Sequence, residues 1–319
     1  MSLQPEQLEN HCTQILKHSR IRNNIVVLCE GSNINDIFER RAIHEYSRME
    51  AMSDANFYKA CLPKWWREKL PRFFNCGDRK DVINTYFKLL ELHKINDENT
   101  WLSPEKLFAL IDLDIQDCPI ENYLFSDTEQ IFHHLYDGMN VNQANASQHR
   151  IWVTGLIHKE AYFLLPELQE VFDNLPLVKP IYNNHSVFLE NIYSDIADDI
   201  CTDIDLKDNL LKACDRIRYC ADLDCSDVNR LRDSWKDKFQ KLQDDLEKEK
   251  MIFALLTIRK AKEYWLKITH PKEWSGSEEN YKDQILLSIA DFYSAQGDNP
   301  KYHISVFFKI LYQKFLEGK

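Results

Sequence analysis

Residues 24–31 read Asn-Ile-Val-Val-Leu-Cys-Glu-Gly, and this stretch decides the fold. Its apolar part is short, unbroken and rich in β-branched side chains, a pattern typical of a strand buried on both faces of a parallel sheet. Glu30 and Gly31 end the strand. A helical pattern then begins at Asp36, with apolar residues at spacings of one, three and four.

Three further apolar runs have the length and composition of strands, at residues 72–76, 106–111 and 150–154. Residues 81–92 lie between the first two of them and have helical periodicity. The order strand, helix, strand, helix, strand and strand over residues 20–175 predicts an α/β fold, with a mostly parallel sheet flanked by crossover helices.

The pattern also divides the chain. We expect a leading helix over residues 1–21, an α/β domain over 22–184 and an all-α C-terminal domain over 185–319. The irregular segment 49–71 is a candidate insertion in the α/β domain. Residues 226–269 show helical periodicity with almost no breaker, which predicts a long, protruding helix suited to a dimer contact.

Composition excludes several classes of protein. Only 7 of the 319 residues are glycine, about 2% against a typical 7%. So few glycines disfavour β-sandwiches and propellers, and neither the dinucleotide-binding nor the P-loop glycine motif occurs. The net charge of −11 disfavours non-specific binding of nucleic acid by the whole surface, but leaves a local basic patch or metal ions open.

The nine cysteines are irregularly spaced and include no C-x-x-C pair, so we expect free thiols in a reducing cytoplasm. Zinc binding by Cys214, Cys220 and Cys225 is disfavoured by their spacing. No signal peptide and no run of 18 apolar residues is visible, so we predict a cytoplasmic protein without a membrane span.

Three carboxylates follow predicted strands. Glu30 comes after the first strand, and Asp112 and Asp114 come after the strand at 106–111. Ligands of open parallel sheets bind beyond the carboxyl ends of the strands. On an extended chain Asp112 and Asp114 face the same way, so both can reach one hard cation such as Mg²⁺. Glu30 can then act as general acid or base beside it.

Two motifs resemble a known family. Val27-Leu28-Cys29-Glu30-Gly31 and Leu110-Ile111-Asp112-Leu113-Asp114 are similar to the two signatures of the Toprim domain, which occurs in topoisomerases, bacterial primases and OLD-family nucleases. The resemblance covers residues 22–175. It implies that Glu30 is the general acid or base, and that Asp112 and Asp114 bind Mg²⁺ or Mn²⁺.

A third segment resembles OLD-like and stand-alone Toprim proteins. There a strand is followed by a stretch similar to residues 160–165, Glu-Ala-Tyr-Phe-Leu-Leu, which makes Glu160 a candidate additional metal ligand. Gly31 permits close backbone approach of a substrate, and Lys159 is a candidate phosphate contact. The alternative for Lys159 and His158 is a solvent-facing loop position.

The leading hypothesis is therefore a Mg²⁺-dependent, nuclease-type Toprim protein that cleaves phosphodiesters in nucleic acid, with DNA preferred over RNA. The alternative is a catalytically degenerate Toprim-like protein that serves as an interaction subunit of a multi-protein system. The chain carries no phosphate-binding loop, so any ATPase would be a separately encoded partner. A homo-oligomer is left open.

Overall fold

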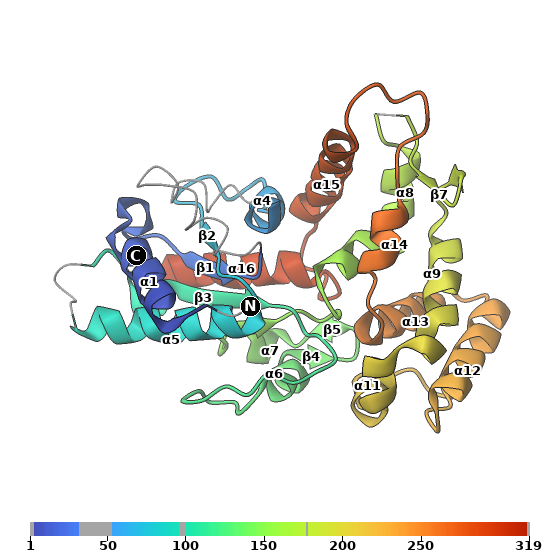
Figure 1. Ribbon diagram of the computed structural model, residues 1–319, viewed down its shortest axis with the longest axis horizontal. Coiled ribbons are helices and arrows are strands. Elements are labelled where there is room, and N and C mark those ends of the chain that lie inside the picture. The colour runs from blue at the N-terminus through green and yellow to red at the C-terminus, as the bar shows by residue number, and fades with distance from the viewer. Residues whose placement is uncertain (1–2, 32–52, 96–99, 177, 318–319) are drawn as a thin grey trace.

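The computed structural model describes residues 3–31, 53–95, 100–176 and 178–317. Its centre is a four-stranded parallel sheet, so the predicted α/β class is confirmed (Figure 1). The helix expected from Asp36 lies outside the described residues. The strands, in their order across the sheet, are β2 (Arg72–Asn75), β1 (Val26–Cys29), β3 (Leu107–Ile111) and β6 (Ile151–Val153).

The two central strands, β1 and β3, have every residue buried. Val26 lies opposite Arg72 of β2 on one side and Leu107 of β3 on the other. A strand with neighbours on both sides and helices on both faces needs apolar side chains throughout, which explains the unbroken apolar runs in the sequence. All four strands end at the same edge of the sheet because they are parallel.

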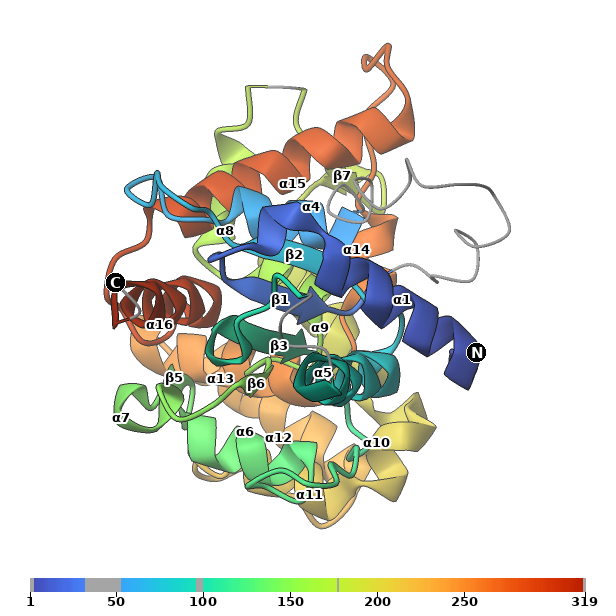
Figure 2. The same ribbon diagram turned by 90° about the vertical axis from the view of Figure 1, so that its left-hand side faces the viewer.

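Helices cover both faces of the sheet. Helices α5 (Arg79–Ile95) and α1 (Pro5–Lys17) lie on one side, and α16 (His303–Glu317) lies on the other (Figure 2). Rings of α16 pack directly on strands: Phe308 lies 6.1 Å from Phe73 of β2, and Phe307 lies 5.0 Å from Trp152 of β6. Helix α16 therefore completes the core around the sheet.

The segment 49–71 is not wholly irregular. Its described part contains helix α4 (Ser53–Ala60). Phe57 and Tyr58 of this helix are each 4% exposed, so the helix is held by packing on the core. This contradicts the expectation of an irregular segment, because burial of one face, and not helix propensity, stabilises so short a helix.

The prediction of a single long helix over residues 226–269 is wrong. The chain forms α12 (Val228–Lys241), α13 (Asp245–Ile258) and α14 (Lys262–Lys267). Leu242 is extended, and the Asp244 carboxylate accepts the Glu247 N–H over 2.9 Å, which caps a new helix. The second half of α13 is buried, so the chain turns back onto the core and does not protrude.

The remaining elements complete the helical part and the edges of the molecule. No helix of the described residues is both long and apolar enough to cross a bilayer. These elements are the helices α6 (Thr128–Leu135), α7 (Gln143–Ala146), α8 (Leu168–Asp173), α9 (Leu189–Asp198), α10 (Ile204–Asp208), α11 (Leu210–Arg216) and α15 (Glu278–Ala295), and the hairpin strands β4 (Tyr136–Asp137), β5 (Asn140–Val141), β7 (Ile181–Tyr182) and β8 (His185–Ser186).

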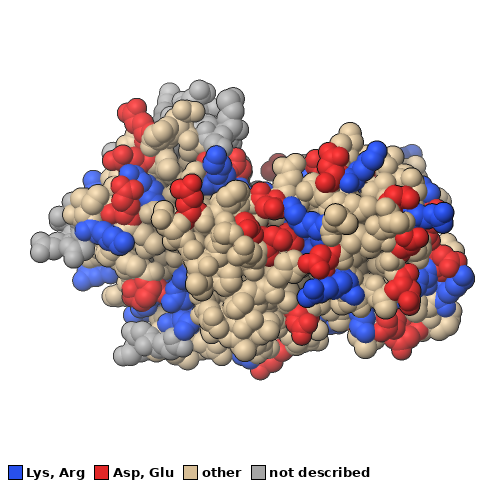
Figure 3. All heavy atoms as spheres, turned by 90° about the horizontal axis from the view of Figure 1, so that it is seen from below, with Lys and Arg blue, Asp and Glu red and all other residues tan. Residues whose placement is uncertain are grey.

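The charges of the surface are mixed. Acidic and basic side chains are interspersed over the face drawn in Figure 3, and neither sign covers its coloured part continuously. The net charge of −11 is thus not concentrated into one field on this face. Local groups of cations inside clefts therefore matter more for binding a phosphate than the overall charge does.

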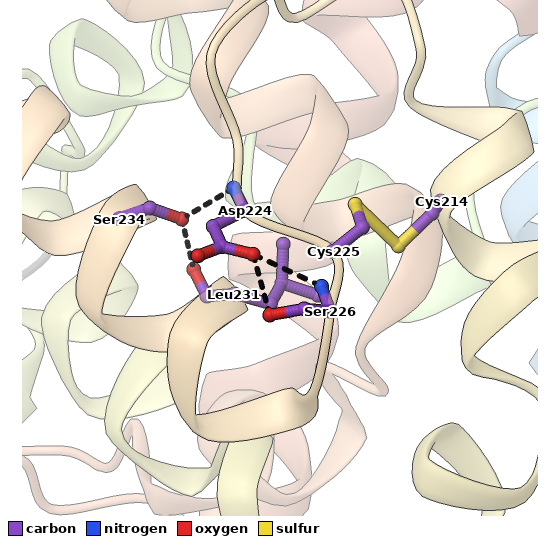
Figure 4. Close-up of a disulfide and its surroundings, with 6 residues drawn as sticks. All are labelled: Cys214, Asp224, Cys225, Ser226, Leu231 and Ser234. Carbon is purple, nitrogen blue, oxygen red and sulfur yellow. Dashed lines mark hydrogen bonds between the residues drawn. A yellow bond between two sulfur atoms is a disulfide. The ribbon is translucent and has the colours of Figure 1, made fainter.

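The expectation that all cysteines are free thiols is wrong for one pair. Cys214 and Cys225 form a disulfide with a Cα–Cα distance of 6.2 Å (Figure 4). The chain reverses between helices α11 and α12, and this turn brings two positions 11 residues apart within disulfide range. The other seven cysteines are free.

Candidate functional site

Glu30 and Asp112 meet at the carboxyl edge of the sheet. They follow the adjacent parallel strands β1 and β3, so both leave the sheet at the same edge. The Asp112 N–H donates a hydrogen bond to Glu30 Oε1 over 2.7 Å. The structure thus brings together two of the residues that the sequence singled out.

Asp114 is placed differently. Its φ angle is +47°, in the left-handed region, so the chain is not extended here and the assumption that Asp112 and Asp114 face the same way is wrong. The Asp114 N–H donates to the Ile157 carbonyl over 2.9 Å, and its own Oδ1 accepts the Ile115 N–H over 2.7 Å. These local bonds stabilise the turn.

Two clefts meet at Glu30. A cleft of about 800 Å³ is lined by Glu30 and Asp114, and a second of about 580 Å³ is lined by Glu30 and Asp112. Glu160 and Lys159 also line the smaller cleft. The two aspartates of the Asp-x-Asp motif therefore face different clefts, with Glu30 at their junction.

The Asp114 carboxylate already has a cation inside the protein. Lys260 Nζ lies 3.5 Å from Asp114 Oδ1 and 3.3 Å from Asp205 Oδ2. The Lys260 side chain is 40% exposed, so water screens this ion pair. A metal ion at Asp114 would compete with a lysine that the sequence motif does not include.

Glu160 is held in place by His158. The Ala261 N–H donates to His158 Nε2 over 3.2 Å, which assigns the ring proton to Nδ1, 3.2 Å from Glu160 Oε2. Burial alone raises the pKa of Glu160, but its 3.2 Å contact with His158 and the charge of Lys159 lower it to about 2. Glu160 is therefore an ionised carboxylate that faces the smaller cleft.

Lys159 is part of the same group of residues. Its backbone N–H donates to the Asp112 carboxyl group, and its ammonium interacts with the negative charges of Glu160 and Glu30. Burial lowers the pKa of Lys159. His158 is buried and Lys159 half-buried, so the alternative of two solvent-facing loop residues is wrong.

Glu30 and Asp112 are poorly solvated carboxyl groups. Burial raises the pKa of Glu30 to about 7, although the Asp112 N–H and Arg79 favour its charged form. Burial, followed by the charges of Glu30 and Glu160, raises the pKa of Asp112 well above its ordinary range. Without a cation, the site therefore holds protons at neutral pH.

Gly31 lines the smaller cleft, but the reason for a glycine lies inside the protein. A Cβ atom at this position would lie 2.6 Å from Asn75 Cγ at the end of β2. The Gly31 N–H also donates to the Gly77 carbonyl over 3.0 Å. The close approach that we expected at Gly31 is thus made by Asn75, and contact with a substrate stays a prediction.

Two residues near the site were missed by sequence reasoning. Tyr58 of α4 lines a small cavity with Glu30 and Asp112, and its pKa is raised well above its ordinary value by burial. No motif marks it, because α4 reaches the site only through packing. Arg79 donates to the Leu113 carbonyl over 2.9 Å. Its position directly after β2, at the same edge of the sheet, was a signal that could have identified it.

The donor set suits a hard divalent cation, since carboxylate oxygens are the ligands that Mg²⁺ and Mn²⁺ prefer. No three His, Cys, Asp or Glu side chains of the described residues are grouped closely enough to hold a metal ion. Mg²⁺ commonly takes only one or two carboxylates, with water and substrate phosphate as its other ligands. Asp112 with Glu160 fits that pattern better than Asp112 with Asp114, because both line one cleft.

Comparisons of the chain with protein-family models, with curated proteins and with solved structures found no match. The resemblance to Toprim domains therefore stays a prediction from the two sequence motifs.

Proposed function

We propose that this protein cleaves phosphodiester bonds in nucleic acid, DNA in preference to RNA, with the help of Mg²⁺ or Mn²⁺. The observation that carries the proposal is the hydrogen-bonded pair of Glu30 and Asp112 at the junction of two clefts, with Glu160 and Lys159 beside it. Such a group of carboxylates beside a lysine is unusual in a core and typical of sites that handle phosphate and metal ions.

Each residue has a distinct role in this proposal. Asp112 and Glu160 would hold the ion, which when bound supplies positive charge to the phosphate being cleaved. Glu30, with a pKa of about 7, exists in both protonation states at neutral pH and can give or accept a proton. The Lys159 ammonium adds positive charge in the smaller cleft, where a phosphate oxygen would lie.

Cations in both clefts support a substrate that extends to both sides of Glu30. Arg79 and Lys80 line the larger cleft, and Lys159 and Lys262 line the smaller one. Basic side chains in this position are a local patch on a chain of net charge −11. They give the phosphates of a polymeric substrate counter-charges before and after the bond that is cleaved.

A second candidate function is that of an interaction subunit without catalysis. The ion pair between Lys260 and Asp114 favours it, because a lysine there substitutes for a metal ion as the partner of the carboxylate. A separately encoded ATPase and a second copy of the chain are the partners that the sequence leaves open in either case.

The test is a nicking assay on supercoiled plasmid DNA, with single-stranded RNA as a parallel substrate, in Mg²⁺, in Mn²⁺ and in chelator. We expect the wild type to nick the plasmid only with a metal ion, and Asp112→Asn to lose about 100-fold or more in rate. Glu279→Gln is the matched control, because it removes one charge from an exposed residue of α15.

Equal rates for the wild type and Asp112→Asn would contradict the proposal. Absence of cleavage by the wild type, together with absence of Mn²⁺ binding in calorimetry, would favour the interaction subunit.

A further inference from the structure

A disulfide joins helix α11 to the segment that leads into α12. Cys214 lies in the last turn of α11, and its sulfur is bonded to that of Cys225 (Figure 4). The segment around Cys225 is fixed, because Asp224 Oδ1 accepts from the N–H and the hydroxyl of Ser226 over 3.0 and 2.6 Å. The Asp224 N–H donates to Ser234 Oγ of α12 over 3.0 Å. The end of α11 is thus anchored to the first turns of α12.

Arg216, two residues after Cys214, reaches the candidate site. Its side chain is 0% exposed, and its Nη1 donates to the Asp114 carbonyl over 2.7 Å. Nε and Nη2 donate to the Glu129 carboxylate of α6 over 3.0 and 2.5 Å. A planar guanidinium fixed by several bonds has one orientation, so Arg216 sets where the Asp114 carbonyl lies.

A second residue of α11 also holds the chain after Asp114. Lys212 forms an ion pair with Asp117, and its Nζ lies 3.5 Å from the Ile115 carbonyl. Helix α11 has only 7 residues, and Leu211 on it is 86% exposed. So short a helix is not stable by itself and depends on its tertiary contacts. Among the tertiary contacts of α11 with other described residues, the disulfide is the covalent one.

We propose that the Cys214–Cys225 disulfide is a redox device that acts through α11 and Arg216 on the conformation of Asp114, with Arg216 as the positioning residue. While the disulfide is intact, α11 holds Arg216 against the Asp114 carbonyl and maintains the left-handed turn. After reduction, α11 is released at its last turn and the turn at Asp114 relaxes. The effect on cleavage rests on the proposed function, whereas the conformational coupling does not.

The redox step needs a dithiol as reductant. One thiolate of the dithiol attacks a sulfur of the disulfide, and the other cysteine leaves as a thiolate. The second thiol of the reductant then displaces the first cysteine from the mixed disulfide. Two electrons and two protons pass to Cys214 and Cys225, which become thiols, and the dithiol becomes a cyclic disulfide. Both cysteines are half-exposed, so a small reductant can reach them.

The amides after β3 report the state of the turn. The N–H groups of Asp112, Leu113, Asp114 and Ile115 each donate a hydrogen bond, with lengths of 2.7, 2.9, 2.9 and 2.7 Å respectively. Amides with such bonds exchange slowly with deuterated water while the turn is intact. Their exchange rate is therefore a readout that requires neither a substrate nor a metal ion.

The experiment begins with alkylation of the native protein and mass spectrometry. Cys214 and Cys225 are expected to resist alkylation until dithiothreitol is added, whereas the free Cys201 is not expected to depend on the reductant. Hydrogen exchange is then compared for oxidised and reduced wild type. We expect reduction to accelerate exchange over residues 112–115 about tenfold or more, and Cys201→Ser to behave as the wild type does.

Arg216→Gln tests the coupling without disturbing the disulfide. In the oxidised variant we expect rapid exchange over residues 112–115, no further acceleration on reduction, and continued protection of α12. The inference is overturned if Cys214 is alkylated without reductant, or if exchange over 112–115 is the same in both redox states. Absence of DNA cleavage in both redox states would instead overturn the proposed function.

Discussion

Glu30 Oε1 accepts the backbone N–H of Asp112 over 2.7 Å, across a sequence separation of 82 residues. The Asp112 carboxyl group in turn accepts the backbone N–H of Lys159. The ends of β1 and β3 and the segment after β6 are therefore joined by a chain of hydrogen bonds through the site. A substitution at one of these residues is expected to alter the protonation of the others.

The first prediction concerns the stability of the Glu30→Gln variant. Burial raises the pKa of Glu30 from 4.5 to about 7 in the folded state. The unfolded chain loses this proton at lower pH than the folded chain does, so the stability that Glu30 contributes below pH 4.5 is lost as pH rises towards 7. We expect Glu30→Gln to be more stable than the wild type at pH 8, by up to about 3 kcal/mol.

Urea denaturation at pH 8 and pH 4.5 measures this difference. The gain in the free energy of unfolding should fall to a few tenths of a kcal/mol at pH 4.5, where the folded wild type carries the proton and about half of the unfolded chains do. A gain of equal size at both pH values would mean that the pKa of Glu30 is not raised. Glu279→Gln serves as the control and should show no gain at either pH.

The second prediction is that divalent cations bind with release of protons. The raised pKa values of Glu30 and Asp112 mean that the ion-free site is protonated at neutral pH. A cation displaces those protons, so its apparent affinity should rise with pH between 6 and 8. Calorimetry of Mn²⁺ binding in two buffers of different ionisation enthalpy counts the protons, and Asp112→Asn should release fewer.

The third prediction concerns Lys260, which neutralises Asp114, a carboxylate whose charge acts on the proposed metal ligand Asp112. The ammonium lies 3.5 Å from Asp114 Oδ1, so its removal leaves that carboxylate with more free negative charge. We expect Lys260→Gln to lower the Mn²⁺ concentration for half-maximal nicking by roughly threefold, a modest effect because the pair is screened by water. Lys272→Gln, at an exposed position, is the control. An increase in the required Mn²⁺ would show that Lys260 helps to bind the substrate.

The fourth prediction compares two glycines. A Cβ atom at Gly155 would overlap His303 Cε1 and lie 2.7 Å from Tyr136 Cε1, whereas at Gly297 it would meet nothing within 4 Å. We expect Gly155→Ala to lower the free energy of unfolding by about 2–3 kcal/mol through overpacking. Gly297→Ala should leave it within about 0.5 kcal/mol. Thermal denaturation distinguishes the two, and equal melting temperatures would contradict the close packing of α16.

The fifth prediction is a loss of stability in acid that depends on His303. The Tyr162 hydroxyl accepts the Gly155 N–H and donates to His303 Nδ1, each over 2.9 Å, so the proton of the neutral ring lies on Nε2 and is donated to the Met139 carbonyl. Burial lowers the pKa of His303 to about 4.

Below pH 6.5 the unfolded chain gains a proton at His303 that the folded chain does not accept until about pH 4. Stability should therefore fall over this interval. His303→Gln removes the titrating ring, so the difference in urea midpoint between pH 7 and pH 4.5 should be smaller than in the wild type. An unchanged difference would assign the acid effect to the other buried histidines.

The location of the site was predictable from the sequence because it depends on local patterns. Apolar runs predict strands whatever they later pack against, and parallel strands end at a common edge. Glu30 and Asp112 were placed correctly at that edge for this reason. The conformation of Asp114 was not predictable, because its left-handed turn depends on Arg216 and Lys260, which are more than 100 residues away in the sequence.

Long-range packing also limited the prediction for the helical segment 226–269. The periodicity of residues 226–269 is helical, and the weak helix-start pattern of Asp244 and Glu247 after Leu242 does not stand out against it. The Asp244 cap stabilises the start of the new helix α13. Burial of the second half of α13 then stabilises the folded chain in which the helix is broken at this point. The periodicity of apolar residues along the sequence does not show which distant residues will pack together, so it could not predict this break.

Helix α16 has a consequence for how the chain reaches its native state. This helix covers one face of the sheet, and Phe307 and Phe308 on it pack against Trp152 and Phe73. During synthesis all four strands leave the ribosome before α16 exists. Until then the aromatic side chains on this face of the sheet are exposed. The partly synthesised chain is therefore prone to associate with other chains or with chaperones. Folding of the sheet is completed only after translation of residues 303–315, and its rate is expected to reflect these contacts of large sequence separation.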